Sequence, residues 1–480
     1  MAKKPARPKE KIKVGYLPLY IKLYDDSNPH YRDYMVDYMN MLIKMLESQG
    51  IEVVEADEVC RIAPEFERAA KKFNDADVTA VITQHLAYSP ALESLASLLT
   101  LKAPIIVFDT TPDYELLSVA NYEGRISPNH GIHGVQDMCN LLKRNNKPYY
   151  LCCGHALHSE VVSEVVGMCR AAAAAKAYKT MTVGSVGGSF TNMGDFLVSD
   201  EEYKSSIGCT VKYMTPEVVK EYVAKVTPEE VEAEIVYDKA NYNVKVANEE
   251  AYKAATLSGL AVRKWMEAEN IGSATVNFLT LDICGLPKMP FVECCKIMQN
   301  YKGYAGEGDV LTAGLVGSLM SVYPNTMFTE MFCPDWEKNL ILMSHMGESN
   351  PNLAAWKPLV TDCPFNYNSC GDTVAMYNCY RDGKAVIVNL APTAPHGEVM
   401  KGENYNLICT EVELLPVGLE NGAYGTSTQG WVKPCKPVKE FLKEYSYAGG
   451  THHSAMVYDV DIEEIKAFGR MMGFNVVEIK

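Results

Sequence analysis

The sequence predicts an α/β protein with two doubly wound parallel-sheet domains and a third, β-rich domain. From Ile12 onward, short β-branched and aromatic runs alternate with longer amphipathic runs, which is typical of strands and helices in a parallel sheet. Past Tyr323 turns rather than long helices separate the strand-like runs, which indicates an antiparallel barrel. At 480 residues the chain is also too long for one core. We therefore expect Rossmann- or flavodoxin-like domains at 1–177 and 178–322 and a barrel-like domain at 323–480.

Composition and charge narrow the class of protein. Hydrophobic residues make up 48% of the chain and charged residues 22%, as in soluble globular proteins. A net charge of −15 argues against nucleic acid or an anionic membrane as a partner. No run of about 18 apolar residues predicts a membrane span. The basic N-terminal stretch lacks the apolar segment of a secretion signal, so secretion is not expected.

The fifteen cysteines indicate a reducing compartment. Their number is odd, none has C-x-x-C spacing, and Cys152–Cys153 and Cys294–Cys295 are adjacent in the chain. This pattern predicts neither a disulfide framework nor a zinc ribbon. Reduced thiols and a cytoplasmic location are the simplest interpretation.

In the first domain the runs follow one another as strand, helix, strand. Strands are expected at residues 13–20, 51–57, 79–85 and 105–110, and helices at 31–50, 64–77 and 94–101. Because ligands bind beyond the carboxyl ends of parallel strands, we expect Tyr20, His85 and Asp109 at a ligand-binding edge. His130 and His133, just before the next helix, share one face if that turn is already helical. The alternative is helix-start capping with surface imidazoles.

The second domain is expected to end in a glycine-rich loop that carries a glutamate. Its expected elements are a strand at 180–186, charged helices over 215–250, a helix at 249–269, a strand at 274–282 and a helix that Pro290 opens. The turn at 187–195 lacks the full glycine spacing of a phosphate-binding loop, so tight-turn chemistry is favoured. In the loop Ala305–Asp309, glycines on both sides of Glu307 allow the backbone to approach an ion closely.

The third domain is expected to be made of strands joined by turns. These strands are expected at 339–346, 385–392, 406–418 and 453–459. Asp461 and Glu464 stand in capping-box order before the last helix, and Gly473 is expected to end it.

Four side chains of these two domains suggest one divalent metal ion. Glu307, Glu330 and His345 stand where apolar residues would cost less, and buried carboxylates are costly unless they are paired or metal-bound. Carboxylates and imidazoles suit Mn²⁺, Co²⁺, Mg²⁺ or Zn²⁺. A fourth ligand is expected from His452 or His453, and only one of them, because neighbours on a strand point to opposite faces. Taken singly, such a glutamate is more often a solvated turn residue and such a histidine a satisfied core residue.

Four motifs resemble the metal-site signature of the L-arabinose isomerase family, relatives of L-fucose isomerase. They are the run CGLPKMPFVECCKIMQNYKGYAGEGDVLTAGLVGSLM, then MFTEMF, ILMSHM and AGGTHHS, in the order of the family. Their spacings are slightly shorter than those of the sugar isomerases. The resemblance implies an aldose–ketose isomerase with Mn²⁺ as the usual metal, Co²⁺ or Mg²⁺ being possible. It also implies a homo-hexamer whose sites lie at subunit boundaries.

The resemblance extends to individual residues. Glu307 and Glu330 are expected to bind the metal and to transfer the proton through an enediolate, with His345 and His453 as further ligands. Contacts to the sugar are expected from the positions listed next. They are His130, His133, Met193 and Thr280.

Two departures from the family change the expected substrate. Thr280 stands where the family has an aromatic residue, and the glutamine expected near Leu19 is missing. A pocket wall of different size and polarity selects a different sugar, so we expect a pentose, a deoxyhexose or a modified, anionic hexose. Lys22, His30 and Arg32 are suited to an anionic sugar, the alternative being a solvated loop. Two rival functions stay open, a non-catalytic sugar-binding protein and a metal-dependent sugar epimerase or aldolase.

Overall fold

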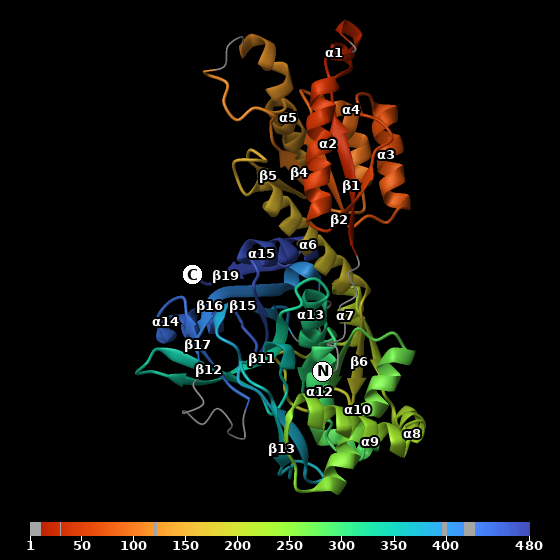
Figure 1. The fold of residues 1–480 in the computed structure, drawn as a ribbon, viewed down its shortest axis with the longest axis vertical. Coiled ribbons are helices and arrows are strands. Elements are labelled where there is room, and N and C mark those ends of the chain that lie inside the picture. Colours follow the sequence, from red (N-terminus) through yellow and green to blue (C-terminus); the bar gives the residue numbers. More distant parts are fainter. Residues whose placement is uncertain (1–10, 29, 119–121, 396–400, 417–427) are drawn as a thin grey trace. The chain divides into compact units, whose positions relative to one another are not determined.

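The computed structural model describes the chain apart from residues 1–10, 29, 119–121, 396–400 and 417–427. Contacts divide it into two compact units, one that ends at Ala173 and one that runs from Ala174 to Lys480 (Figure 1). Across the described residues, no helix has both the length and the apolar character needed to cross a membrane. The expectation about the basic N-terminal stretch concerns residues outside this part of the chain.

The first unit contains a five-stranded parallel sheet, which confirms the predicted α/β class. Its strand order is β2-β1-β3-β4-β5. All of β3 and most of β1 are buried, as in parallel sheets that helices cover on both faces. The strands are β1 (Ile12–Leu19), β2 (Ile51–Glu55), β3 (Ala80–His85), β4 (Ile105–Asp109) and β5 (Tyr149–Cys153). The helices are α1 (Lys22–Ser27), α2 (Asp33–Ser48), α3 (Ala63–Asp75), α4 (Ala91–Thr100), α5 (Ile132–Arg144) and α6 (Val161–Thr180).

The second unit begins with a four-stranded parallel sheet of order β10-β9-β6-β7. The strands are β6 (Thr182–Val186), β7 (Thr210–Tyr213), β9 (Ser273–Val276) and β10 (Gly303–Gly306). The helices around it are α7 (Asp200–Ser206), α8 (Pro216–Ala224), α9 (Pro228–Asn241), α10 (Glu249–Ala268), α11 (Leu281–Cys284) and α12 (Phe291–Gln299). A small sheet pairs β13 (Leu359–Cys363) with β8 (Asn243–Lys245) and β14 (Thr373–Tyr377).

The strand predicted at 274–282 is wrong over its second half. β9 ends at Val276, and Asn277 then accepts a hydrogen bond from the backbone N–H of Leu279 at 3.0 Å. A short polar side chain that bonds the backbone two residues on favours a turn over a strand. Apolar content alone could not show this, because the turn residues 278–281 are themselves apolar.

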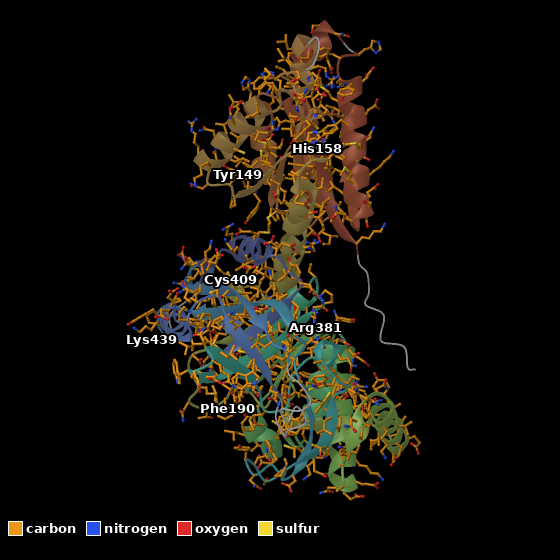
Figure 2. The ribbon with its side chains drawn as sticks, turned by 60° about the vertical axis from the view of Figure 1, so that its left-hand side comes forward. Tyr149, His158, Phe190, Arg381, Cys409 and Lys439 are labelled. Atoms are coloured by element: carbon orange, nitrogen blue, oxygen red, sulfur yellow. The ribbon has the colours of Figure 1, made fainter. Side chains whose placement is uncertain are left out.

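The rest of the second unit is an antiparallel six-stranded barrel, which confirms the predicted β-rich domain. Its strands follow one another as β15-β18-β11-β12-β17-β16, and pairing of β15 with β16 closes the ring. They are β11 (Thr326–Asp335), β12 (Leu340–Ser344), β15 (Gly383–Pro392), β16 (Tyr405–Leu414), β17 (Gly430–Pro434) and β18 (His453–Tyr458). The other elements are β19 (Asn475–Glu478), parallel to β16, and the helices α14 (Val438–Tyr447) and α15 (Ile462–Met472). Cys409, labelled in Figure 2, is a buried residue of β16.

The last helix begins differently from the capping box that its sequence predicts. Asp461 accepts from the N–H of Glu463 at 2.9 Å, whereas the carboxylate of Glu464 accepts from the buried hydroxyl of Tyr323 at 2.9 Å. The tertiary partner therefore takes the side chain that would have closed the box. Gly473 ends the helix in the left-handed conformation, as predicted.

One buried helix connects the parallel sheet to the barrel. All residues of α13 (Val310–Met320) are buried, as expected of a helix that is apolar on every side. It contacts β6, β9 and β10 of the parallel sheet and also β11, β15 and β18 of the barrel. The loop that carries Glu307 thus enters α13 where the two sheets meet.

Candidate functional site

The backbone around Glu307 is fixed in an uncommon conformation. Glu307 has a φ of 62°, in the left-handed region that non-glycine residues seldom adopt, and Gly308 follows at 77°. The N–H of Glu307 donates to the carbonyl of Val276 at 3.0 Å, and its carbonyl accepts from the N–H of Phe190 at 3.1 Å. Backbone strain that neighbouring contacts hold in place is typical of functional sites.

The barrel strands bring the other three predicted ligands together. Glu330 on β11 is the register partner of His453 on β18 and of Ser344 on β12. His345 follows the last residue of β12. The antiparallel register therefore sets a carboxylate beside two imidazoles that are distant in the sequence.

His453 is the centre of the resulting cluster. Its Nε2 lies 3.5 Å from Glu307 Oε2, and Glu330 Oε2 lies 4.0 Å from His345 Nε2. Ligand atoms of Glu307, His452 and His453 lie within 4.8 Å of one another, as do those of Glu330, His345 and His453. All four predicted metal ligands are thus gathered in two overlapping groups that share His453.

Two buried carboxylates orient the imidazoles. Asp309 Oδ2 lies 2.9 Å from His453 Nδ1, and Glu348 Oε2 lies 2.6 Å from His345 Nδ1. Glu348 also accepts from the hydroxyl of Tyr304 at 3.1 Å. A carboxylate that accepts the Nδ1 proton leaves the Nε2 lone pair free, which is the usual arrangement behind a metal-ligating histidine.

The donor set fits a cation. His453 is fully buried, and its Nε2 has no hydrogen-bond partner among the described residues. A buried polar atom without a partner is costly, so it calls for a bound group. Phe196 stacks on the His453 ring at 5.1 Å, and Phe328 meets the His345 and His453 rings edge-on at 4.8 and 4.9 Å. These aromatic rings hold the imidazoles in a site that carboxylates and imidazoles alone could supply with ligands.

The cluster shifts the ionisation of its own members. Burial by itself raises the pKa of Glu307, but the imidazoles of His452 and His453 outweigh burial and hold that pKa well below its usual range. Burial raises the pKa of Glu330. Burial lowers the pKa of His453, yet the carboxylates of Asp309 and Glu307 more than offset it, so the pKa is raised. Two carboxylates whose environments move their pKa values apart suit different steps of a proton transfer.

Two of the predicted sugar contacts lie in the second unit. Met193 is half-buried in the turn that follows β6. Thr280 donates from its hydroxyl to the carbonyl of Gly187 at 2.9 Å, so the side chain supports that same turn. Gly308 lies against this turn as well, because a Cβ there would come within 2.2 Å of the carbonyl oxygen of Gly188.

The other predicted sugar contacts lie in the first unit. Nε2 of His130 and Nδ1 of His133 are 2.6 Å apart, so the two rings do share a face at the start of α5. The cations proposed for an anionic sugar are paired there with carboxylates. Lys22 pairs with Asp26, His30 with Asp33, and Arg32 with Asp25. These pairings favour the interpretation of that segment as a solvated surface.

The expectation that only one of the adjacent histidines reaches the site is wrong. His452 Nε2 lies 3.6 Å from Glu307 Oε2, almost as close as His453. Strand alternation does not apply to this pair, because β18 begins only at His453. Asp309 and Glu348 were not predicted either. Asp309 caps α13 and Glu348 follows His345 by three residues, signals that indicate position in the chain but not a contact with an imidazole.

Two domain models match most of the second unit. The L-arabinose isomerase central domain matches residues 192–324, and the L-arabinose isomerase C-terminal domain matches residues 325–475. Side by side, the two matches cover more than half of the chain.

Whole relatives extend this similarity. L-arabinose isomerase of Aeromonas salmonicida is 24% identical over 405 residues, which cover 82% of this chain and 79% of that protein. L-arabinose isomerase of Oceanobacillus iheyensis is 23% identical over 441 residues, or 89% of each chain. L-arabinose isomerase of Pediococcus pentosaceus is 27% identical over 295 residues, which cover 58% of this chain and 59% of that protein. With both domain models matched in order and relatives aligned along most of its length, the chain belongs to the L-arabinose isomerase family of sugar isomerases.

Proposed function

We propose that this protein interconverts an aldose and a ketose, with a divalent metal ion held by Glu307, Glu330, His345 and His453. One observation carries the proposal. Two carboxylates and two imidazoles surround the unpartnered Nε2 of His453, and each imidazole is already tied through Nδ1 to a carboxylate. A sugar-binding protein needs no such set, because neutral hydrogen-bonding groups suffice to bind a sugar.

The carboxylates perform the proton transfer. A divalent cation bound here supplies Lewis-acid stabilisation of negative charge on the two substrate oxygens. Glu307 and Glu330 come from a loop and from a barrel strand, so they approach the cluster from different elements. One of them removes the proton from C2 of the aldose, and a proton is returned at C1 to give the ketose. The aromatic rings of Phe196 and Phe328 help to keep water away from the reacting carbons.

We extend the proposal to the substrate and the setting. The substrate is a pentose, a deoxyhexose or a modified, anionic hexose, because Thr280 is smaller and more polar than an aromatic residue and its hydroxyl is engaged by Gly187. Mn²⁺ is the proposed metal, and a homo-hexamer the proposed assembly, on the strength of the family resemblance. All fifteen cysteines are free, which supports the cytoplasm as the proposed location.

A sugar panel in D₂O tests the reaction. Aldopentoses, deoxyhexoses and hexose derivatives with carboxylate or sulfonate groups are incubated with the protein and Mn²⁺, before and after chelation. The proposal expects a ketose that carries solvent deuterium at C1, and loss of turnover in the chelated protein. Sugar fragments would indicate an aldolase, and a second aldose an epimerase. A protein that binds sugar equally well after chelation and converts none would be a binding protein.

Gly306→Ala is expected to weaken metal binding. A Cβ on Gly306 would lie 2.7 Å from Cε1 and 3.2 Å from Nε2 of His345, so the imidazole must move. Loss of ligand orientation lowers metal affinity by about 10-fold or more. Mn²⁺ titration followed by electron paramagnetic resonance measures this. The matched control is Gly194→Ala, since a Cβ there meets nothing within 4 Å. Equal Mn²⁺ affinity in both variants would contradict the role of His345.

A further inference from the structure

A third imidazole stands beside Glu307 and has no part in the proposed metal site. His452 Nε2 lies 3.6 Å from Glu307 Oε2, and the rings of His452 and His453 are 4.2 Å apart between centroids. The His452 side chain is 30% exposed, whereas those of His453 and His345 are 0% and 2% exposed. His452 therefore lies on the accessible side of the cluster.

Asp195 holds the His452 ring in one orientation. Its Oδ2 accepts from the backbone N–H of His452 at 3.0 Å and lies 2.6 Å from the ring Nδ1. The ring of Phe196 lies 5.5 Å from that of His452. This arrangement matches the carboxylate partners of His453 and His345, in which Nδ1 is engaged and Nε2 points to the glutamates.

We propose that His452 contacts the substrate, with its Nε2 hydrogen-bonded to a sugar hydroxyl beside Glu307, and that Asp195 is the positioning residue for it. This inference rests on the proposed isomerase function. A hydroxyl group both donates and accepts, so Nε2 can bind it whether or not that nitrogen carries a proton. The exposed position of the ring allows a small molecule to reach Nε2, and the fixed Nδ1 contact limits the positions that the hydroxyl can take.

Metal ligation is the competing role for His452. Its Nε2 lies within 4.8 Å of ligand atoms of Glu307 and His453, so these three residues could hold an ion. Two observations favour the substrate. The ring is exposed where the proposed ligands His345 and His453 are buried, and Glu330 and His345 already complete a ligand set around His453.

A pair of variants tests the contact. His452→Asn keeps a polar atom near Asp195 but none at the position of Nε2, whereas His452→Gln places its terminal amide near that position. His452→Asn is expected to lower kcat/KM by about 10- to 100-fold, chiefly through KM, and His452→Gln to recover part of the loss. Mn²⁺ affinity is expected to stay within about twofold of the wild type in both variants, since a ligand role would change it by more.

Selectivity gives a readout that a structural role would not move. The ratio of kcat/KM between an aldose and its deoxy analogues is expected to shrink in His452→Asn for the analogue that lacks the contacted hydroxyl. Asp195→Asn is expected to act in the same direction with a smaller effect. Asp200→Asn is the control, because Asp200 stands in the same segment and accepts from Tyr213 instead at 2.8 Å.

Each outcome decides the inference. Wild-type kcat/KM and selectivity in His452→Asn would overturn it, and so would Mn²⁺ affinity reduced 10-fold with turnover restored by added Mn²⁺. A wild type that converts no sugar of the panel would instead overturn the proposed function. Titration of both proteins with ribitol, L-arabinitol and L-fucitol then tests the contact alone. Weaker polyol binding by the variant supports it, and equal or absent binding overturns it.

Discussion

Glu330→Gln is expected to lower kcat for aldose–ketose conversion by about 10²- to 10⁴-fold, the range in which a positioned general acid or base contributes. The amide keeps the shape of the carboxylate but cannot accept a proton from carbon. Glu330 is paired in register with His453 and lies 4.0 Å from His345, so its replacement also removes one negative ligand from the cluster. Initial rates at saturating Mn²⁺ and at several sugar concentrations measure the loss.

The control for this variant lies in the hairpin that joins β11 and β12. Glu337 is exposed near the tip of that hairpin, and Glu337→Gln is expected to leave kcat within about twofold of the wild type. Circular dichroism of both variants checks that the fold is kept. A Glu330→Gln protein with wild-type kcat would exclude Glu330 from proton transfer.

Asp309→Asn is expected to weaken Mn²⁺ binding by about 10- to 100-fold while the protein stays folded. Asp309 is fully buried, accepts from the N–H of Thr312 at the start of α13 and faces Nδ1 of His453 at 2.9 Å. Asparagine is as good a helix cap as aspartate, so α13 is preserved. Its neutral amide no longer favours the His453 tautomer with a free Nε2, and metal affinity falls for that reason.

The matched control is Asp461→Asn, another capping aspartate with no imidazole partner among its described contacts. Asp461 accepts from the N–H of Glu463 at the start of α15. Both variants are expected to lose little thermal stability, and only Asp309→Asn to lose Mn²⁺ affinity. Equal Mn²⁺ affinity in the two proteins would show that the Asp309 contact does not orient a metal ligand.

The layered fold could be predicted because its strands carry strong local patterns. β1 and β3 are nearly continuous apolar runs, which is typical of strands buried on both faces of a parallel sheet. Boundaries were less accessible. β9 ends where the side chain of Asn277 bonds the backbone, and Glu464 leaves its expected cap for Tyr323. A contact with a residue distant in the sequence decides such a case, and periodicity carries no information about it.

The site was predictable in its residue types but not in its contacts. Glu307, Glu330, His345 and His453 stand out because charged and imidazole side chains interrupt apolar runs. Their convergence depends on the register of β11 with β18, which no local pattern specifies.

The residues that orient the site were not predicted. Asp309, Glu348 and Asp195 each engage Nδ1 of a histidine. In the sequence these acids look like helix-cap or surface residues, and only the folded chain shows what they contact.

Anomalous diffraction from crystals grown with Mn²⁺ tests the central claim most directly. We expect one Mn²⁺ ion per chain, bound by Glu307, Glu330, His345 and His453. Its coordination should include the Nε2 atoms of both histidines, because their Nδ1 atoms are engaged by Glu348 and Asp309. Anomalous density at another place, or none at these four residues with Mn²⁺ in excess, would contradict a metal-dependent isomerase site in this protein.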